Sequence, residues 1–281
     1  MDVNKSKFRF NDDFTVTPEI KQTFDEYGYI IVRGLLDKEE VELITKAIES
    51  PDGLQKQRYS LNDPEQRPID RVIWNHPGND ITGMLARSEK VAGTSAQLMG
   101  GEVYHYHSKL MMKEEKTGGR HMWHQDYGYW YHNGCLLPDM MTVFIPVDPC
   151  VKANGCLEGR IDHKFGTILA EADLERVEAI KQHTSLVYVE MNPGDAVFFH
   201  CNILHSSGPN NSELRRWVFL SAYNKATNNP VKKHHHPFYT PLKMVPNEAI
   251  RKCTVLTDIT GKEFITPGTN SYIIKPPEEQ P

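Results

Sequence analysis

Apolar and polar residues repeat along this chain with two different periods. In the first hundred residues, apolar positions recur every three to four residues, as in helices that bury one face. Thr17 followed by Pro18 predicts a helix start, and the helix should end near Gly28. Asp37 caps a second predicted helix, and residues 80–99 predict further helix. Between the first two helices, residues 29–33 predict a buried strand.

From residue 103 the pattern changes to short runs of β-branched and aromatic residues, separated by turn signals such as Asn154-Gly155. One helix, from Asp173 to His183, interrupts them. Helices first and strands afterwards predict a mainly β fold with flanking helices, an antiparallel barrel or sandwich. The predicted strands cover residues 103–112, 141–147, 186–191, 196–199 and 216–223.

A length of 281 residues suits one large domain with a full core. We therefore expect a single domain over residues 1–281. A helical N-terminal buttress should occupy about 15–100 and the β-barrel core about 103–225. A C-terminal wrap, rich in Pro and His, should cover about 226–281.

Composition narrows the class of partner. The formal net charge of −5, without a long basic run, argues against nucleic-acid binding. No apolar run approaches the length of a membrane span, and the N-terminus lacks a hydrophobic signal core. The 5 cysteines show no C-x-x-C spacing and indicate reduced thiols. We expect a cytoplasmic protein, a monomer or weak homo-oligomer, without nucleic-acid or membrane partners.

The most informative chemistry is a pair of histidines and one carboxylate. His124-Gln-Asp126 would place both side chains on the same side of a strand, and His205 follows in a distant strand region. Two imidazoles and a carboxylate on one face of a metal are typical of non-haem Fe(II) oxygenases. Taken singly, the histidines also fit surface positions, and Asp126 also fits a turn cap.

A cation follows these candidate ligands. Strand alternation allows only one of Arg215 and Arg216 to point inward. A buried guanidinium needs a carboxylate partner, and the distal carboxylate of 2-oxoglutarate offers matched bidentate geometry to Arg216. Ser207, two residues after His205, is placed to donate a hydrogen bond to the same carboxylate. Alternatively, Arg216 is an exposed strand residue.

These motifs together resemble the phytanoyl-CoA dioxygenase family. The resemblance runs from about residue 27 to about residue 224 and is carried by residues 123–127, 154–157 and 193–196, with His205 and Arg216. It implies a double-stranded β-helix (jelly-roll, cupin-like) barrel and an oxygenase that uses Fe(2+), 2-oxoglutarate and O2. The implied iron ligands are His124, Asp126 and His205, and the implied 2-oxoglutarate clamp is Arg216 with Ser207.

The resemblance also implies that the strand around residues 105–111 lines the pocket, with His107, Lys109 and Met111 on one face. His107 and Lys109 are candidates for holding the co-substrate or a polar substrate; Lys109 is equally a candidate for a structural ion pair. Aromatic residues follow the ligand Asp and either wall the substrate chamber or pack in the barrel. They are Tyr127, Tyr129, Trp130 and Tyr131.

One departure from the family pattern stands beside the site. After Leu157 the chain passes directly to Gly159 and the segment 160–163, so it looks shortened by most of a strand. A missing inner strand leaves backbone groups unpaired, at a cost of about 1–3 kcal/mol each when buried. We therefore expect either a substitute segment or an impaired site.

Three classes of function compete. The first is an oxygenase that hydroxylates or otherwise oxidises a C–H bond of a small polar or amphipathic metabolite, releasing succinate and CO2. The sequence has no basic groove for coenzyme A phosphates, although a phytanoyl-CoA-like acyl substrate stays an alternative. The second is a catalytically impaired protein that binds metal and 2-oxoglutarate. The third is a cupin-like isomerase or hydrolase with another metal, in which Arg216 would lack a purpose.

Overall fold

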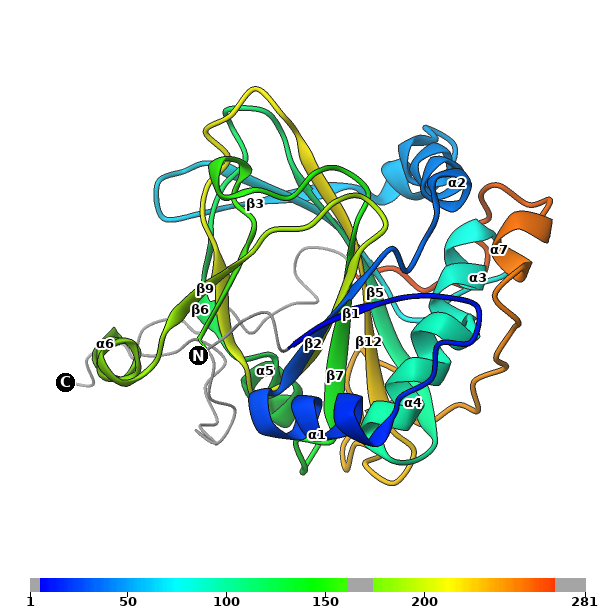
Figure 1. Ribbon diagram of the computed structural model, residues 1–281. Coiled ribbons are helices and arrows are strands. Elements are labelled where there is room, and N and C mark those ends of the chain that lie inside the picture. Colours follow the sequence, from blue (N-terminus) through cyan, green and yellow to red (C-terminus); the bar gives the residue numbers. More distant parts are fainter. Residues whose placement is uncertain (1–5, 161–173, 266–281) are drawn as a thin grey trace.

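Two β-sheets face one another in the computed structural model, which describes residues 6–160 and 174–265 (Figure 1). The larger sheet has the strand order β1-β2-β10-β7-β12-β5-β4-β3, and the smaller β6-β11-β8-β9. All neighbours pair antiparallel except β1 and β2. The strands are β1 Lys7–Arg9, β2 Tyr29–Arg33, β3 Tyr59–Asn62, β4 Pro68–Trp74, β5 Val103–Lys113, β6 His121–His124, β7 Met140–Pro146, β8 Leu157–Arg160, β9 Leu186–Val189, β10 Ala196–His200, β11 Leu204–Ser207 and β12 Arg216–Lys225.

Helices cover the outer face of the large sheet, so the molecule has three layers (Figure 1). Helices α2, α3, α4 and α7 lie on one side of this sheet, and the small sheet lies on the other. The helices are α1 Pro18–Tyr27, α2 Lys38–Glu49, α3 Ile81–Arg87, α4 Thr94–Met99, α5 Asp126–His132, α6 Leu174–His183 and α7 Ala249–Lys252. Shorter helical turns are η2 Leu54–Gln57, η3 Glu89–Gly93 and η4 Lys152–Asn154.

The predicted helix ends of the N-terminal part are confirmed. The Thr17 side chain accepts a hydrogen bond from the backbone N–H of Ile20, and Gly28 ends α1 with a φ of 75°. Asp37 and Glu40 form a capping box at the start of α2. Residues 80–99 form three consecutive helical segments, α3, η3 and α4, because the chain is extended at Ser88 (φ −64°, ψ 149°).

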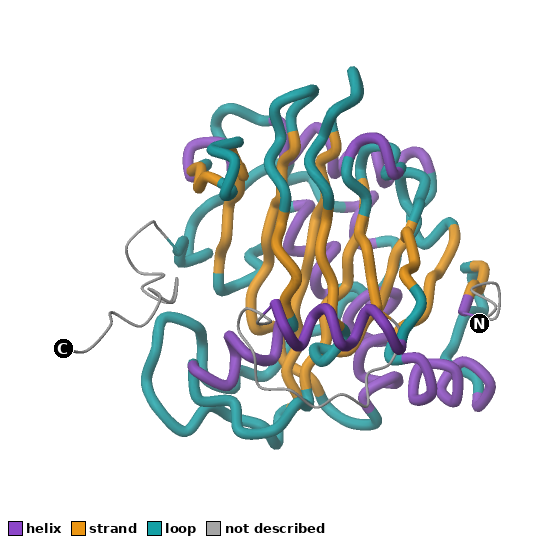
Figure 2. The backbone as a smooth tube through the Cα atoms, turned by 90° about the vertical axis from the view of Figure 1, so that its left-hand side faces the viewer, coloured by secondary structure: helices purple, strands orange, loops and turns teal. Residues whose placement is uncertain are grey.

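Strand alternation divides the core into two faces. On β7, Val143 and Ile145 pack beneath the helices, whereas Thr142 and Phe144 face the small sheet. Each fully buried side chain of this size contributes roughly 1.5–3 kcal/mol from removal of apolar surface from water. The face toward the helices is therefore apolar, and the face toward the small sheet is free to carry polar chemistry. Figure 2 shows the strands running side by side through the molecule.

The double-stranded β-helix prediction is confirmed at the level of two facing sheets. In the described ranges, however, the sheets do not close into a hydrogen-bonded barrel. The N-terminal buttress is also not purely helical, because β3 and β4 extend the large sheet with residues that precede 103. Strands β1, β3, β4, β6, β8 and β11 were not among the predicted ones.

The expectation of a missing inner strand is wrong. Residues 157–160 form β8, which pairs with β11 on one side and β9 on the other along all four positions. Its backbone groups therefore have partners, and the cost of unpaired groups does not arise at these residues. Residues 161–163 of the apparently shortened segment lie outside the described residues, as do Asp173 and residues 266–281 of the C-terminal wrap.

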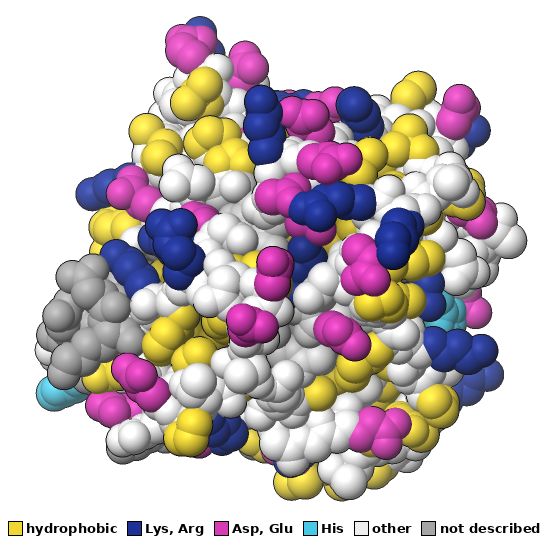
Figure 3. All heavy atoms as spheres, turned by 45° about the vertical axis from the view of Figure 1, so that its right-hand side comes forward, with side chains coloured by type: hydrophobic (Ala, Val, Ile, Leu, Met, Phe, Trp, Pro, Cys, Tyr) yellow, Lys and Arg dark blue, Asp and Glu magenta, His cyan; other side chains and the backbone are white. Residues whose placement is uncertain are grey.

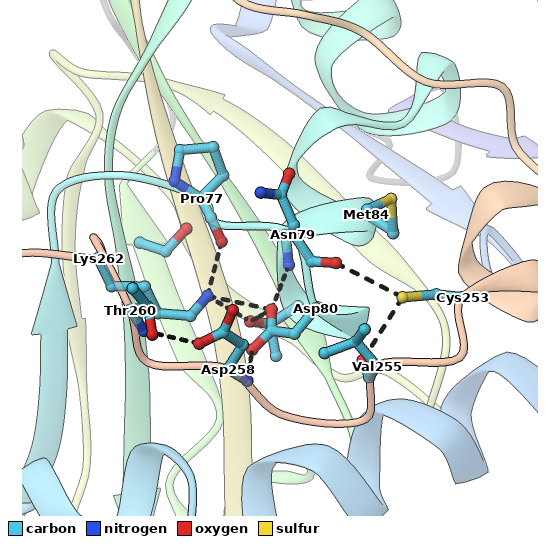
Figure 4. Close-up of polar contacts among 12 residues, drawn as sticks. Pro77, Asn79, Asp80, Met84, Cys253, Val255, Asp258, Thr260 and Lys262 are labelled. Carbon is cyan, nitrogen blue, oxygen red and sulfur yellow. Dashed lines mark hydrogen bonds and ion pairs between the residues drawn. The ribbon is translucent and has the colours of Figure 1, made fainter.

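The C-terminal segment is held against the helices by a buried ion pair. Lys262, which is 0% exposed, extends its ammonium to the Asp80 carboxylate at 3.1 Å and to the Pro77 carbonyl oxygen at 2.6 Å (Figure 4). The Thr82 hydroxyl lies at 3.1 Å from the same nitrogen. Helix α7 packs on α2 and α3. The ion pair of Lys262 and the packing of α7 therefore hold this part of the C-terminal segment against the helical layer.

The face drawn in Figure 3 carries Lys, Arg, Asp and Glu side chains of both signs interspersed. Within the part of the chain that the structure describes, every helix is too short or too polar to traverse a lipid bilayer.

Candidate metal centre

Three predicted ligands converge between the two sheets. His124 ends β6 and His205 lies on β11, and the two residues are direct cross-strand neighbours. Their ring centroids are 4.1 Å apart. One ligand atom each from His124, Asp126 and His205 lies within 4.8 Å of the other two. This is the only group of three or more such side chains found among the described residues, and its spacing fits a single ion.

Backbone carbonyl groups orient both imidazole rings. Nδ1 of His124 lies 2.8 Å from the Met122 carbonyl oxygen, and Nδ1 of His205 lies 2.9 Å from that of Ile203. A carbonyl only accepts, so each Nδ1 carries the proton and donates it. The Nε2 lone pair of each ring is therefore left for a metal, which is the usual arrangement behind histidine ligands.

Asp126 reaches the site by a different route from the predicted one. The structure places it at the first residue of α5 and not on a strand with His124. Gln125, between them, turns into the protein and donates to the Asn202 carbonyl oxygen at 2.6 Å. The chain thus bends immediately after β6. The Thr142 hydroxyl donates to Oδ2 of Asp126 at 2.8 Å, which leaves Oδ1, 3.8 Å from His124 Nε2, for a metal.

The protonation states suit metal binding, which requires neutral imidazoles and an ionised carboxylate. Burial, followed by the nearby His205, lowers the pKa of His124 to about 4. Burial alone would raise the pKa of Asp126, but the electrostatic influence of its neighbours His205 and Lys109 outweighs it and lowers that pKa. At neutral pH, His124 is therefore neutral and Asp126 is charged.

Next to the triad is a cavity of about 80 Å³ that contains Arg216. Arg216 is 2% exposed and its Nε has no hydrogen-bond partner. The guanidinium carbon lies 5.9 Å from the Phe144 ring centroid. In the described parts of the chain no carboxylate pairs with Arg216, and burial lowers its pKa. A buried charge without a partner is costly, so the cavity suits an anionic ligand.

Arg215 points the other way, as strand alternation requires. Its guanidinium pairs with Asp148 at 3.0 Å and with Glu49 at 2.5 Å. The choice of Arg216 as the inward cation therefore agrees with the geometry.

Ser207 lines the same cavity and is oriented by a buried lysine. Lys113 is 2% exposed, and its ammonium donates to the Ser207 hydroxyl oxygen at 2.9 Å and to the Gly208 carbonyl oxygen. Because that hydroxyl oxygen already accepts, its own proton is available for a ligand in the cavity. Burial, followed by the adjacent Arg216, lowers the pKa of Lys113 well below its usual value.

A second and larger cavity of about 600 Å³ opens on the other side of the triad. The two cavities share five lining residues, so they meet at the metal site. These shared residues are Lys109, Met111, His121, His124 and Asp126. A ligand in either space is therefore adjacent to the candidate metal.

The predicted lining strand is in place. His107, Lys109 and Met111 of β5 all line the smaller cavity, as their shared face requires. No ion pair or hydrogen bond is found for the Lys109 ammonium among the described residues, so it is not a structural ion pair there. Burial lowers the pKa of Lys109, against the influence of Asp126.

The aromatic run after Asp126 divides into two roles. Tyr127 and Trp130 pack in a core cluster with Tyr106, and neither lines a cavity, because both point into the protein from α5. Tyr129 does line the larger cavity, and its hydroxyl lies 3.0 Å from Nε2 of His236. Tyr131 is 38% exposed. The aromatic wall is thus reduced to Tyr129.

Four polar residues at the site were not predicted: Thr142, Lys113, Arg71 and His236. Thr142 was within reach of the sequence, because alternation along the predicted strand 141–147 puts it on one face with Phe144. Arg71 was missed because β4 itself was missed. His236, from the C-terminal segment, stacks on His107 with centroids 4.7 Å apart, and no local pattern signals so distant a contact.

The geometry and the comparisons with known proteins define the same class, the non-haem iron dioxygenases that depend on 2-oxoglutarate and O2. The family model "Phytanoyl-CoA dioxygenase (PhyH)" matches residues 24–218. The chain is 32% identical over 252 residues to an L-proline trans-4-hydroxylase of Streptomyces griseoviridis, covering 81% of this chain and 94% of that protein. It is 24% identical over 253 residues to an ectoine dioxygenase of Streptomyces avermitilis, covering 81% and 84%. The chain therefore belongs to the phytanoyl-CoA dioxygenase family.

Solved structures support the fold. The crystal structure of EctD from S. alaskensis with 2-oxoglutarate and 5-hydroxyectoine superposes with a TM-score of 0.74 at 21% identity, covering 85% of this chain and 91% of that one. The same protein with bound Fe gives a TM-score of 0.72, at the same identity and coverage. At these identities the likeness establishes the jelly-roll fold of this class.

Proposed function

We propose that this protein hydroxylates, or otherwise oxidises, an unactivated C–H bond of a small metabolite, with release of succinate and CO2. The overall conversion is 2-oxoglutarate + O2 + R–H to succinate + CO2 + R–OH, and its atoms balance. The observation that carries the proposal is the convergence of His124, Asp126 and His205 with one unprotonated ligand atom each facing the others. Three protein ligands on one face leave positions for a co-substrate.

In this proposal His124, Asp126 and His205 hold Fe(II), which supplies the oxidising chemistry with 2-oxoglutarate and O2. Thr142 fixes the Asp126 carboxylate by its hydrogen bond, and the Met122 and Ile203 carbonyls fix the two rings. These partners hold the ligand atoms in place before the metal arrives, so little conformational entropy is lost on binding.

The smaller cavity is assigned to 2-oxoglutarate. Arg216 pairs with the distal carboxylate, and the Ser207 proton, left free by the Lys113 hydrogen bond, donates to the same group. A dicarboxylate bound here neutralises a charge that otherwise has no partner in the described structure. His107 and Lys109 border the same space and complete its polar lining.

The larger cavity is assigned to the substrate. Its volume of about 600 Å³ lies within the usual range of small-molecule sites, roughly 300–1,000 Å³. The names of two relatives, an L-proline hydroxylase and an ectoine dioxygenase, also point to small metabolites. Intact pairing of β8 removes the reason, drawn from the sequence, for expecting an impaired site.

Turnover tests the proposal. Purified protein with Fe(II), ascorbate and 2-oxoglutarate is incubated with a library of small metabolites, and succinate is quantified. Substrate-dependent succinate that requires both iron and 2-oxoglutarate is expected. The Asp126→Ala variant should lose it while circular dichroism shows a retained fold. Unchanged turnover in Asp126→Ala would refute the ligand assignment.

A further inference from the structure

The larger cavity contains an arginine that the proposed chemistry does not use. On β4, Ile69, Arg71 and Ile73 line this cavity, whereas Val72 and Trp74 pack beneath the helices. This is the alternation of a strand with one face in the core. Arg71 is paired in register with Met111 of β5, which lines both cavities. The Arg71 side chain therefore points into the cavity and not into the core beneath the helices.

Arg71 has no partner within the described parts of the chain. Its Nε is buried without a hydrogen bond, and no carboxylate forms an ion pair with it. Asp70, the adjacent carboxylate, is already taken by Arg58 at 2.5 Å and by the Ser60 hydroxyl. Burial lowers the pKa of Arg71. A cation placed in this way stabilises the fold poorly, and its position suits an anion supplied from outside.

The remaining charges of the cavity also favour an anion. Asp63 is saturated, because its carboxylate accepts hydrogen bonds from the backbone N–H groups of Glu65, Arg67 and Arg120. The Arg120 side chain lines the cavity but pairs with Glu65 at 2.9 Å. Asp126 belongs to the metal site. Arg71 and Lys109 are thus the two cations in the cavity without a carboxylate partner in the described structure.

The position of Arg71 relative to the metal site defines how a ligand would lie. Lys109 and Met111 line both cavities, and their strand neighbours across the β4–β5 pair are Ile73 and Arg71. Arg71 and the metal ligands His124 and Asp126 therefore line one continuous cavity. A ligand anchored at Arg71 extends toward His124 and Asp126.

Part of the lining of the larger cavity is apolar. Leu61, Pro64, Ile69 and Ile73 border the space, and Met111 lies at its junction with the smaller cavity. These apolar side chains suit a short hydrocarbon or a saturated ring.

We propose that Arg71 binds the carboxylate of the substrate, and that the substrate is a small molecule with a free carboxylate on a compact apolar body. The guanidinium donates two parallel N–H hydrogen bonds to the two carboxylate oxygens, which fixes the orientation of the C–H bond presented to the metal. This inference rests on the proposed function, since it assumes that the larger cavity is the substrate chamber.

Calorimetry on the full chain tests it in two titrations. Mn(II) replaces iron so that no turnover occurs, and 2-oxoglutarate is titrated first; this step reports on the proposed function alone. The second titration uses the proteinogenic amino acids and straight-chain carboxylic acids, each beside its primary amide. The proteins are wild type, Arg71→Gln, Arg71→Lys and the control Arg215→Gln, whose cation pairs with Glu49 and Asp148 and lines neither cavity.

At least one acid should bind to the wild type, and its amide should bind at least about tenfold more weakly. Arg71→Gln should lower the affinity for that acid by about 10- to 100-fold, as expected for loss of a charged hydrogen bond. The affinity of this variant for the amide should equal that of the wild type. Arg71→Lys should restore part of the affinity for the acid, and Arg215→Gln should leave that affinity unchanged. All four proteins should bind 2-oxoglutarate equally.

Three results overturn the inference while 2-oxoglutarate binding is normal: equal affinity for acid and amide, unchanged affinity of Arg71→Gln for the acid, or no acid that binds at all. Failure of the wild type to bind Mn(II) and 2-oxoglutarate is a different outcome. It contradicts the proposed function. The role of Arg71 is then tested separately, by comparing the affinities for the acid and its amide.

Discussion

His124 and His205 are cross-strand partners on β6 and β11, and each ring makes a hydrogen bond to the carbonyl group two residues before it in the chain. The same type of backbone hydrogen bond thus orients both rings, so that the two Nε2 atoms face the same metal position from two strands. Because adjacent strands are about 4.8 Å apart, the pair can bracket one ion without any change of backbone. Asp126, from the first turn of α5, completes the site.

Acid should destabilise the metal-free protein. Burial lowers the pKa of His124 to about 4 and that of His105 to about 3, and it lowers the pKa of His107 and His236 well below the usual value. Below pH 6.5 the unfolded chain therefore takes up protons that the folded chain does not. Stability should be complete above about pH 6.5 and fall as the pH drops toward 4, by up to about 1.4 kcal/mol per pH unit for each group.

Urea unfolding in the presence of a chelator, at about pH 7.5 and about pH 5, measures this difference. The His183→Gln variant, altered at an exposed histidine on α6, should show the same loss as the wild type. A free energy of unfolding that is equal at the two pH values contradicts the assignment of the buried histidines as neutral.

Thr142→Val should weaken metal binding without removing a ligand. The substitution keeps the shape of the side chain but deletes the hydroxyl that holds Oδ2 of Asp126. Loss of such an outer partner typically lowers metal affinity by about 10- to 100-fold. Competition with a chromophoric chelator measures the affinity, and Thr142→Ser serves as the control that keeps the donor. Equal affinities for the valine variant and the wild type would show that Thr142 is irrelevant to the metal.

Arg216 and Arg215 form a matched pair for testing the co-substrate pocket. Arg216→Met removes a buried, unpaired charge, so 2-oxoglutarate affinity should fall by about 30-fold or more, as for loss of one side of a buried charge pair. The free energy of unfolding of the ligand-free protein should stay equal or rise by about 1–3 kcal/mol. Both are measured by calorimetry and denaturation.

Arg215→Met should behave in the opposite way. It breaks ion pairs with Asp148 and Glu49 at a partly exposed position, so stability should fall by about 1 kcal/mol or less, and 2-oxoglutarate affinity should be unchanged. If Arg215→Met impairs co-substrate binding as much as Arg216→Met does, the inward and outward assignments are wrong.

Lys262→Met should destabilise the whole fold. The variant leaves the Asp80 carboxylate, 1% exposed, without its buried cation, and such a loss usually costs about 3–5 kcal/mol. Denaturant unfolding measures it beside Lys252→Met, which breaks an exposed pair with Glu248 and should cost less than about 1 kcal/mol. Similar values for the two variants would mean that the Lys262 ion pair does not anchor the C-terminal segment.

The sequence predicted the parts of this protein whose signals are local. The caps at Thr17 and Asp37 mark helix starts because their side chains bond to the next turn, and the long strands β5, β7 and β12 carry clear apolar patterns. Strand β8 was misjudged, because a four-residue strand with Gly159 at its centre has too little pattern to be recognised.

Residues brought in by tertiary contacts were out of reach. Lys113 and His236 reach the site through contacts with another strand or from the C-terminal segment, and no spacing along the chain encodes those contacts. The candidate ligands were recognisable because His124 and Asp126 lie two residues apart. The sequence did not predict that β6 ends at His124 and that α5 begins at Asp126, which is how the two ligands converge.

The most direct test of the account is anaerobic titration of Fe(II) into the metal-free wild type and into His205→Ala and Asp126→Ala, with the fold of each checked by circular dichroism. We expect about one high-affinity ion per chain in the wild type, and affinity reduced by about 100-fold or more in both variants, beyond the loss seen for outer partners. Equal Fe(II) binding by all three folded proteins would contradict it.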